Sequence, residues 1–380
     1  MKQQDNYEKL CKFYEIMVGR IPDRDQFKHA LKMTIEESTL APIFMMPLSG
    51  SISFTKLVKK SRMNADDLMT SLRALASEGF VLMYENNKGL FCERGNPIFM
   101  AEQQVRKHDA TQQRKIYAQF FNRGIEGNLE EAIETKTPYY RVLPVEQTIT
   151  DSSLLRTIDI DVALPAPGEV IPIDIATDLV KKEAKLISVA KCFCRLTKRE
   201  IENGCDHPLE TCFVFNEHAQ SLINYGTARK IDFKDMVEIL RDCEKQGLVH
   251  NVDNCSKNIR SLCNCCPCCC ILLKSINRGE NFAGASSRYT VRSEIELCNA
   301  CKSCIPLCPT GARKLENAKV KVNINGCIGC GLCVTACPEG VNSMRLRGET
   351  PKIQDSFTSL YAKIGREALY SIIRKKIFRV

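Results

Sequence analysis

Residues 298–309 read CNACKSCIPLCP, and residues 327–338 read CIGCGLCVTACP. Both stretches have the spacing C-x2-C-x2-C-x3-C-P, and their first cysteines, Cys298 and Cys327, are 29 residues apart. The chain therefore contains an internal repeat whose unit carries four cysteines and a proline. Such a fixed spacing of thiols is typical of a metal-binding fold.

The spacing has a physical reason. A [4Fe–4S] cluster needs four converging thiolates, and a C-x2-C-x2-C loop can wrap three of its corners while the cysteine before the proline reaches a second cluster. A pair of zinc ribbons is the alternative, but zinc sites typically use C-x2-C pairs from separate knuckles, with four ligands per site. The pattern therefore favours two iron–sulfur clusters.

The repeat resembles the bacterial two-cluster [4Fe–4S] ferredoxins, and all eight expected cysteines are present. The resemblance implies one-electron transfer at low potential. It also implies one cluster on Cys298, Cys301, Cys304 and Cys337, and another on Cys327, Cys330, Cys333 and Cys308. Lys302, Arg313 and Lys314 make the module more basic than acidic ferredoxins, which indicates an acidic partner, an internal electron donor or simply a solvated surface.

The cysteine content and the composition of the N-terminus indicate the cellular compartment of the protein. There are 22 cysteines in 380 residues, and 20 of them lie between Cys192 and Cys337. The N-terminus is charged and lacks the apolar stretch of a signal peptide, and no run approaches the ~18 apolar residues of a membrane span. We therefore expect a soluble, cytoplasmic protein, in which clustered cysteines bind metal rather than form disulfides. The net charge of +9 is too diffuse to indicate nucleic acid by itself.

The middle of the chain carries further candidate metal ligands. Residues 187–195, ISVAKCFCR, are predicted to form a strand, in which positions i and i+2 share a face. Residues 203–212, NGCDHPLETC, are predicted to form a loop that could fold over a metal. The stretch 263–270, CNCCPCCC, follows. The candidate ligands are Cys192, Cys194, Cys205, Cys212, Cys263, Cys265, Cys266, Cys268, Cys269 and Cys270.

The run 263–270 places six cysteines in eight positions. Neighbouring side chains diverge, so adjacent cysteines should not serve the same iron, and the run should divide its thiols among two or more centres or leave some unligated. One or two additional Fe–S clusters are the first interpretation. A zinc or thiolate-storage role is the second, and a redox-active pair such as Cys265–Cys266 is the third.

Residues 137–275 also resemble a group of multi-cysteine 4Fe-4S binding proteins of anaerobic bacteria and archaea. The matching stretches are RVLPVEQTI, AKCFCR, GCDHPLETC, GTARKI, GLVHNVDN and CNCCPCCC. The likeness implies cluster binding and little more. The CCG motif of related anaerobic reductase subunits is absent, because Pro267 follows Cys266 and Ile271 follows Cys270.

Other side chains of the middle region have less specific patterns. His250 could ligate iron or donate to a cluster, but a structural role is slightly favoured. Arg195 and Arg229 are candidate cations beside a cluster, with solvated surface as the alternative. Cys243 falls on the apolar face of a helix that Asp232 should cap and Gly247 should end, so it is expected in the core.

The N-terminal region coarsely resembles a winged helix in the order and length of its elements. A short helix at 53–61, a longer helix at 65–79 and a hairpin at 81–94 are predicted. The longer helix would face DNA, but Asp66 and Asp67 near its start would repel phosphate. A structural or partner-docking role is therefore favoured, and DNA binding is unlikely.

The sequence thus predicts an α+β, multidomain chain. The expected units are a winged-helix-like module (1–100), a helix and extended linker region (101–173), a mixed α/β cysteine-rich metal-binding domain (174–285), the two-cluster domain (286–348) and an amphipathic basic helix (349–380). That last helix could contact a membrane surface or a partner, or pack on the core of the protein.

The function expected is transfer of single electrons to or from a redox protein partner, a reductase or dehydrogenase, with at least one further Fe–S cluster in the middle domain. A catalytic subunit of an anaerobic reductase, with its active site at the middle cysteines, is the alternative. A redox-responsive DNA-binding regulator ranks lower. The sequence leaves the oligomeric state open.

Overall fold

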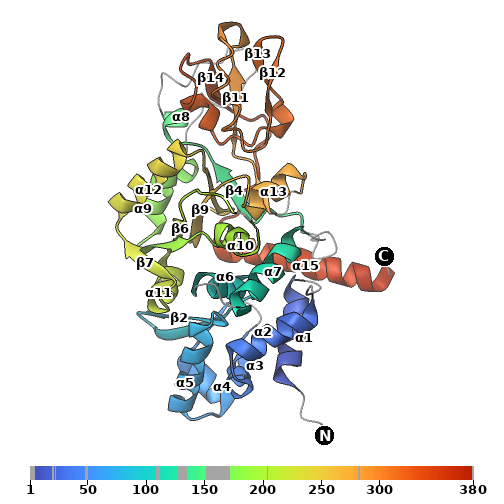
Figure 1. Cartoon of the computed structure of the whole chain (residues 1–380). Helices are drawn as coiled ribbons and strands as arrows, with labels where there is room; N and C mark the ends of the chain where they lie inside the picture. Colours follow the sequence, from blue (N-terminus) through green and yellow to red (C-terminus); the bar gives the residue numbers. More distant parts are fainter. Residues whose placement is uncertain are drawn as a thin grey trace.

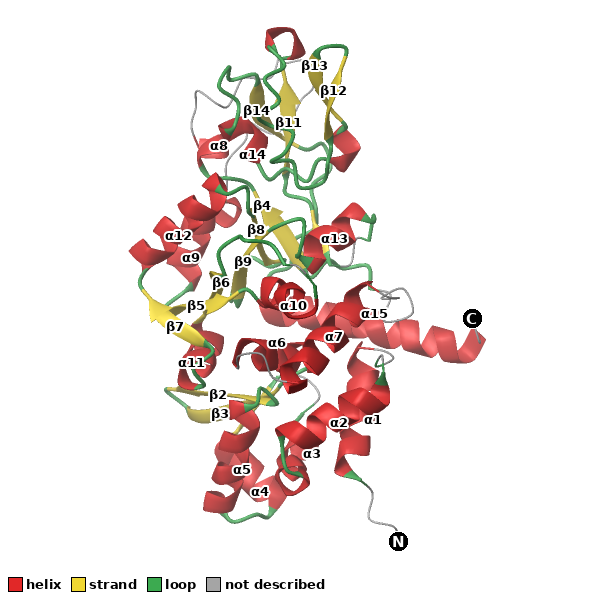
Figure 2. Ribbon diagram, in the orientation of Figure 1, coloured by secondary structure: helices red, strands yellow, loops and turns green. Residues whose placement is uncertain are grey.

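The structure is a computed structural model, and it describes residues 5–18, 21, 23–47, 50–107, 112–126, 135–150, 172–202, 204–280 and 283–378. Helices and strands are mixed within these residues. Figure 1 shows an elongated molecule, with the N-terminal helices at one end, a sheet in the middle and the cysteine repeat at the other end. Figure 2 shows that helices dominate the N-terminal end. The end of the predicted linker region, the Pro-rich residues 163–173, lies almost entirely outside the described residues.

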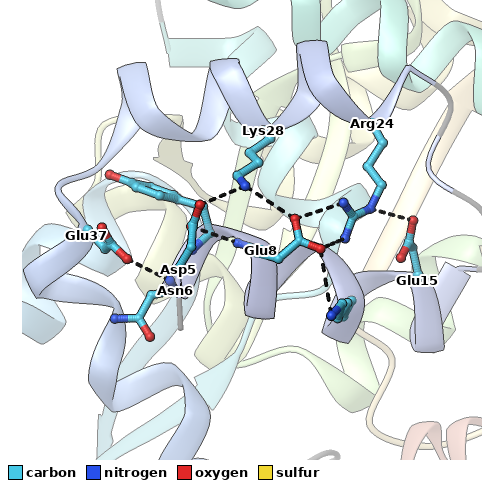
Figure 3. A network of polar contacts seen from close by, with 9 residues as sticks. Asp5, Asn6, Glu8, Glu15, Arg24, Lys28 and Glu37 are labelled. Carbon is cyan, nitrogen blue, oxygen red and sulfur yellow. Dashed lines mark hydrogen bonds and ion pairs between the residues drawn. The ribbon is translucent and has the colours of Figure 1, made fainter. Parts of the chain in front are cut away.

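The first two helices, α1 (Asn6–Val18) and α2 (Arg24–Thr34), are joined by an ionic network. The guanidinium of Arg24 donates two hydrogen bonds to the carboxylate of Glu8, at 2.9 and 2.7 Å, and Lys28 donates to the same carboxylate at 3.3 Å (Figure 3). The hydrogen bonds from Arg24 lower the pKa of Glu8 to about 2. The network links the two helices, although ion pairs at the surface add little stability.

A compact helical unit with a small sheet follows. It consists of η1 (Glu37–Leu40), α3 (Ala41–Met45), β1 (Ser51–Ser53), α4 (Phe54–Ser61), α5 (Ala65–Ser77), β2 (Val81–Asn86) and β3 (Gly89–Arg94). The predicted short helix, longer helix and hairpin are therefore confirmed, and the antiparallel strand order is β1-β3-β2. Asn64 caps the start of helix α5, because its side chain accepts a hydrogen bond from the N–H of Asp66.

Two further helices, α6 (Pro97–Lys107) and α7 (Gln112–Glu126), connect this unit to the sheet. Both pack against α10 (Phe193–Ile201), and α7 also packs against α2. The next segment was predicted to be extended, and within it Tyr140–Leu143 forms β4, which pairs with a strand of the central sheet on each side. The division of the chain into domains remains a prediction at this point.

The central sheet has seven strands in the order β10-β4-β8-β9-β6-β5-β7. Neighbouring strands are antiparallel, except for the parallel pair β10 and β4. The strands besides β4 are β5 (Ile187–Lys191), β6 (Glu210–Phe215), β7 (Ala228–Ile231), β8 (Val249–Asp253), β9 (Ser261–Cys265) and β10 (Gly284–Ala285). This order places β6 beside β9, so cysteines far apart in the sequence become neighbours.

Several short helices cover and connect the strands. They are α8 (Gln147–Thr150), η2 (Pro172–Asp174), α9 (Ala176–Glu183), α11 (Asn216–Asn224), α12 (Phe233–Lys245) and α13 (Ile271–Asn277). The predicted cap of α12 is confirmed, because the Asp232 side chain accepts a hydrogen bond from the N–H of Asp235 at 2.8 Å. Cys243 is buried on α12, as its place on the apolar face predicts.

The predicted strand at 187–195 is too long. Strand β5 ends at Lys191, Cys192 is the residue before α10, and Cys194 lies in the first turn of that helix. The chain turns here because the N–H of Cys192 bonds to the carbonyl oxygen of Leu209, which lies next to β6. Cys192 and Cys194 therefore lie near each other at a helix start, not on one face of a strand.

The cysteine repeat forms a separate layer of short elements. They are β11 (Tyr289–Ser293), η3 (Ile295–Leu297), β12 (Arg313–Glu316), β13 (Lys319–Val322), η4 (Ile324–Gly326), α14 (Leu332–Thr335) and β14 (Asn342–Leu346). Strand β11 pairs with β14 and β12 pairs with β13, both antiparallel. The first cysteine motif lies in the segment between η3 and β12, and the second lies between η4 and β14 and includes α14.

The C-terminal helix, α15 (Phe357–Phe378), is confirmed, and its two halves differ. Phe357 and Leu360 are buried in the core of the sheet, whereas Leu369 and Tyr370 are 57% and 70% exposed. Figure 1 shows the second half extending away from the rest of the protein. The first turns of the helix therefore pack on the core, and its middle is held by Glu367, whose carboxylate accepts hydrogen bonds from the N–H and the hydroxyl of Thr137. Among the described helices, none is long and apolar enough to cross a membrane.

Candidate metal centres

The two cysteine loops of the repeat have the same backbone shape at equivalent positions. In the first loop Ala300 and Lys302 have φ angles of 59° and 66°, and in the second Gly329 and Gly331 have 71° and 81°. These are the second and fourth residues after the first cysteine of each copy. Left-handed backbone is ordinary for glycine but costs ~1–2 kcal/mol for other residues. The first loop thus keeps a strained shape that fits a loop wrapped around a cluster.

The structure brings the second predicted ligand set of the repeat together. Burial raises the pKa of Cys330, and the thiols of the other three members of its set, one of which is Cys308 from the first copy, raise it further. In the other set burial raises the pKa of Cys304, and Cys337 from the second copy adds to that effect. These charge interactions agree with an exchange of the fourth cysteine between the copies.

The two ligand sets differ in their exposure. Cys301 is exposed, whereas every member of the set that contains Cys330 is buried or half-buried. The carbonyl oxygen of Cys330 accepts a hydrogen bond from the N–H of Val145, which follows β4, at 2.9 Å. The set that contains Cys330 therefore faces the central sheet, and the set that contains Cys301 faces outward.

Arg313 lies between the two sets and is not the solvated surface residue that was considered. Its side chain is 3% exposed, its Nη1 lies 3.7 Å from the Sγ of Cys304, and its Nη2 donates to Oδ1 of Asn342 at 3.0 Å. It also interacts with Cys333 of the other set. Lys302 and Lys314 remain exposed. One buried guanidinium thus interacts with ligand sulfurs of both predicted clusters.

The ten candidate cysteines of the middle region divide into two groups. The first, called the six-thiol group, is a chain of neighbouring thiols from α10, β6, β9 and the start of α13. Cys212 and Cys263 are directly paired across β6 and β9. The members in order of contact are Cys263, Cys212, Cys192, Cys194, Cys270 and Cys265.

The second, called the four-thiol group, consists of Cys205, Cys266, Cys268 and Cys269, whose sulfurs all lie within 4.8 Å of one another. The expectation that adjacent cysteines diverge holds for 265 and 266 and for 269 and 270, which belong to different groups. It is wrong for Cys268 and Cys269, whose sulfurs are 3.8 Å apart. Residues 267–269 form a turn rather than a strand, so neighbouring side chains do not alternate there.

Two buried arginines lie beside these groups. Arg195 is fully buried and donates to the carbonyl oxygens of Pro208 and Asn264, at 2.5 and 2.7 Å, and to Oγ1 of Thr211 at 2.7 Å. A hydrogen bond from the Cys269 thiol, followed by the charge of Arg195, lowers the pKa of Cys266 to about 4. Arg195 is therefore a cation beside both groups, since it also interacts with members of the six-thiol group.

The second arginine was missed by the sequence analysis. The side chain of Arg106, on α6, is 5% exposed and interacts with Cys212, Cys192 and Cys263. Its position follows from the packing of α6 on α10, and no local pattern indicates it. Arg229, by contrast, forms an exposed ion pair with Glu210 at 2.9 Å and is a surface residue.

His250 has a structural role in this arrangement. Its Nδ1 is 2.5 Å from Oδ1 of Asn264 and its Nε2 is 3.0 Å from Oε1 of Glu244. Both ring nitrogens are therefore occupied, and neither is directed at a cysteine. Asn264 was not predicted as part of the site, although it lies within the cysteine run and bonds to the carbonyl oxygen of Thr211 at 2.8 Å.

The repeat and the six-thiol group share one hydrophobic cluster. Cys265 and Cys270 pack in the same cluster as Cys330, together with Val145 and Leu332. Asn277, at the end of α13, also donates a hydrogen bond to the carbonyl oxygen of Pro309 in the repeat, at 3.1 Å. The inner ligand set of the repeat and the six-thiol group are therefore joined by a continuous packed interior.

Comparison with known proteins identifies the class of one part of the chain. Residues 290–338 match a family described as a 4Fe-4S dicluster domain, and the match contains all eight cysteines of the repeat. This part of the chain is therefore an iron–sulfur, ferredoxin-like domain. No curated protein and no solved structure matches the chain.

Proposed function

We propose that this protein is an iron–sulfur electron carrier whose ferredoxin-like domain exchanges single electrons with a further Fe–S centre on the six-thiol group. The observation that carries the proposal is the shared hydrophobic cluster of Cys330, Cys265 and Cys270. When bound, [4Fe–4S] clusters supply one-electron transfer at a potential set by charge, hydrogen bonds and exposure. A packed interior between two ligand sets excludes water from the path between them.

The cysteines of the repeat fit two clusters in the proposed arrangement. The pair of cross-connected ligand sets, the strained backbone at Ala300 and Lys302 and the buried Arg313 all suit thiolates that hold an anionic centre. In the middle domain, Arg106 and Arg195 supply positive charge beside the six-thiol group. Buried thiolates require such compensation, because an unpaired buried charge is strongly unfavourable.

The two ligand sets of the ferredoxin-like domain have different roles in this electron transfer. A redox partner exchanges electrons at the outer set, where Cys301 and Lys302 are exposed and Leu297 is 54% exposed. An exposed cation at this set suits a partner with an acidic docking face. The inner set, which contains Cys330, exchanges electrons with the six-thiol group in the central sheet. The compartment proposed is the cytoplasm, where the many free thiols stay reduced.

Counting iron and sulfide tests the proposal directly. The chain purified without oxygen should contain about twelve iron and twelve sulfide per chain, and more only if the middle holds a second cluster. Fully reduced protein should show an EPR signal beyond those of the ferredoxin-like domain, broadened by coupling to it. About eight iron with no additional signal would show that the six-thiol group is not a cluster site.

A catalytic role is the second candidate, and one observation favours it. The six-thiol group has two thiols more than one [4Fe–4S] cluster needs, so it could hold an unusual centre that reacts with a substrate. The ferredoxin-like domain would then supply its electrons. A change of the additional EPR signal on adding small ligands such as cyanide would support catalysis. Turnover with redox proteins alone, and no change of signal, would support the electron carrier.

We also propose that the N-terminal unit is a winged-helix-like module that docks a protein partner. Asp66 and Asp67 are exposed in the first turn of α5, where a DNA-reading helix would need donors for phosphate. Salt-dependent binding to a specific DNA sequence in a gel-shift assay would overturn this assignment.

A further inference from the structure

The four-thiol group has the dimensions of a site for a single metal ion. Four thiolates at about 2.3 Å from one zinc ion, at the corners of a tetrahedron, lie about 3.8 Å from one another. The sulfur of Cys205 is 3.8 Å from that of Cys266 and 3.6 Å from that of Cys269. The sulfur of Cys268 is 3.8 Å from that of Cys269. These distances are far longer than the roughly 2.0 Å of a disulfide.

The ferredoxin-like domain provides an internal comparison for this spacing. A [4Fe–4S] cube places four irons between its thiolates, which separates the sulfurs well beyond the edge of a mononuclear tetrahedron. The eight cysteines of the repeat, all within the described residues, contain no three sulfurs within 4.8 Å of one another. The six-thiol group likewise contains no three sulfurs within 4.8 Å of one another. The four-thiol group is therefore the one described cluster of cysteines that is too tight for a cube.

We propose that Cys205, Cys266, Cys268 and Cys269 bind a single tetrahedral metal ion of the zinc type, separate from the iron–sulfur centres. The donor set is the one zinc uses in closed structural sites, in which all four positions are filled by protein thiolates. Four thiolates around a divalent ion leave a net charge of −2, and Arg195 lies beside Cys266 to offset part of it. Cys243 and Leu248 form an apolar wall behind the group.

The position of the site indicates a structural role, because its ligands come from two separate segments of the chain. Cys205 lies in the loop before β6, and the other three ligands lie in the turn between β9 and α13. The loop is also held by Arg199, which donates to the carbonyl oxygens of Cys205 and His207 at 2.8 and 3.0 Å. One ion would link these segments and fix the turn whose flanking residues, Cys265 and Cys270, belong to the six-thiol group.

The first experiment measures the metal in the unmodified full-length protein, purified without oxygen. Elemental analysis should find about one zinc per chain in addition to the cluster iron, and X-ray absorption at the zinc edge should find four sulfurs at about 2.3 Å. Growth with cobalt should replace the zinc by cobalt with the intense visible absorption of a tetrahedral thiolate site. The absence of any such ion, with iron present only in amounts matched by sulfide, would overturn the proposal.

Variants then assign the ion to these residues. Cys268→Ser, at the most exposed ligand, should lose the one zinc while iron, sulfide and the EPR signals of the clusters stay unchanged. Cys268→His should restore zinc binding, because histidine is also a zinc ligand. Cys243→Ala is the matched control, since this buried thiol packs beside the group without belonging to it, and zinc should be retained.

The outcomes separate this proposal from the proposed electron-transfer function. Loss of one zinc, or of one iron without sulfide, in Cys268→Ser supports a mononuclear site. Loss of about four iron together with four sulfide would show that the group holds a cube and would overturn the proposal. The electron-transfer proposal is tested by the iron and sulfide content of the unmodified protein, so failure here leaves that proposal standing.

Discussion

The ferredoxin-like domain and the central sheet both gather cysteines, but they do so in different ways. In the ferredoxin-like domain each predicted ligand set comes from two short segments with a fixed spacing, so the sequence alone indicates the chemistry. In the sheet the thiols arrive from α10, β6, β9, α13 and two loops, and only the strand order brings them together. A local motif can be recognised from spacing, whereas a site assembled by topology requires the fold.

The largest expected effect is a loss of iron from the central sheet but not from the ferredoxin-like domain. Cys212→Ser removes a buried thiol at the centre of the six-thiol group, where it is paired with Cys263 across two strands. We expect the iron content to fall from about twelve to about eight per chain, because one cluster loses its ligand. The ferredoxin-like domain should keep its two clusters, as measured by iron and sulfide analysis and by EPR.

Cys255→Ser is the matched control for that substitution. Cys255 is buried at the end of the same sheet but belongs to neither thiol group, and its Sγ donates only to the carbonyl oxygen of Lys257, at 3.4 Å. Serine can keep this hydrogen bond, so the iron content should not change. Equal iron in Cys212→Ser and in the control would show that Cys212 is not a cluster ligand.

The next effect concerns the stability of the sheet. Arg195→Met removes a buried guanidinium that bonds to Pro208, Thr211 and Asn264, and it leaves their oxygens without a partner. We expect the free energy of unfolding to fall by about 3 kcal/mol, as measured by urea denaturation. Arg195→Lys should recover only part of the loss, because lysine keeps the charge but lacks the planar fork. An unchanged urea midpoint in Arg195→Met would contradict this role.

The two regions also differ in how much of their structure could be predicted from the sequence. The repeat, the helix-and-hairpin order of residues 53–94 and the cap at Asp232 depend on neighbouring residues, so local patterns sufficed. Strand β4 and Arg106 could not be assigned, because their roles depend on contacts with segments far away in the chain. The convergence of Cys268 and Cys269 required the turn that follows β9.

A smaller effect is expected at the arginine of the ferredoxin-like domain. Arg313→Gln removes a positive charge beside Cys304 and Cys333, and reduction of a cluster adds a negative charge there. The midpoint potentials should fall by tens of millivolts, because the reduced state loses a favourable interaction. Lys302→Gln, at an exposed residue of the same domain, should change them far less, since salt screens that charge. Equal shifts in redox titrations of the two variants would argue against a special role for Arg313.

The smallest effect tests whether the two cysteine loops of the repeat are held in one shape. Ala300 has a φ angle of 59°, where the second copy has Gly329. Ala300→Gly should therefore stabilise the domain by about 0.5 kcal/mol, because relief of strain outweighs the larger entropy of the unfolded chain. Ala336→Gly, at an ordinary φ of −83°, should destabilise it by a similar amount. Thermal unfolding of the cluster-loaded protein measures both, and destabilisation by Ala300→Gly would show that the first loop does not adopt the glycine-like shape of the second.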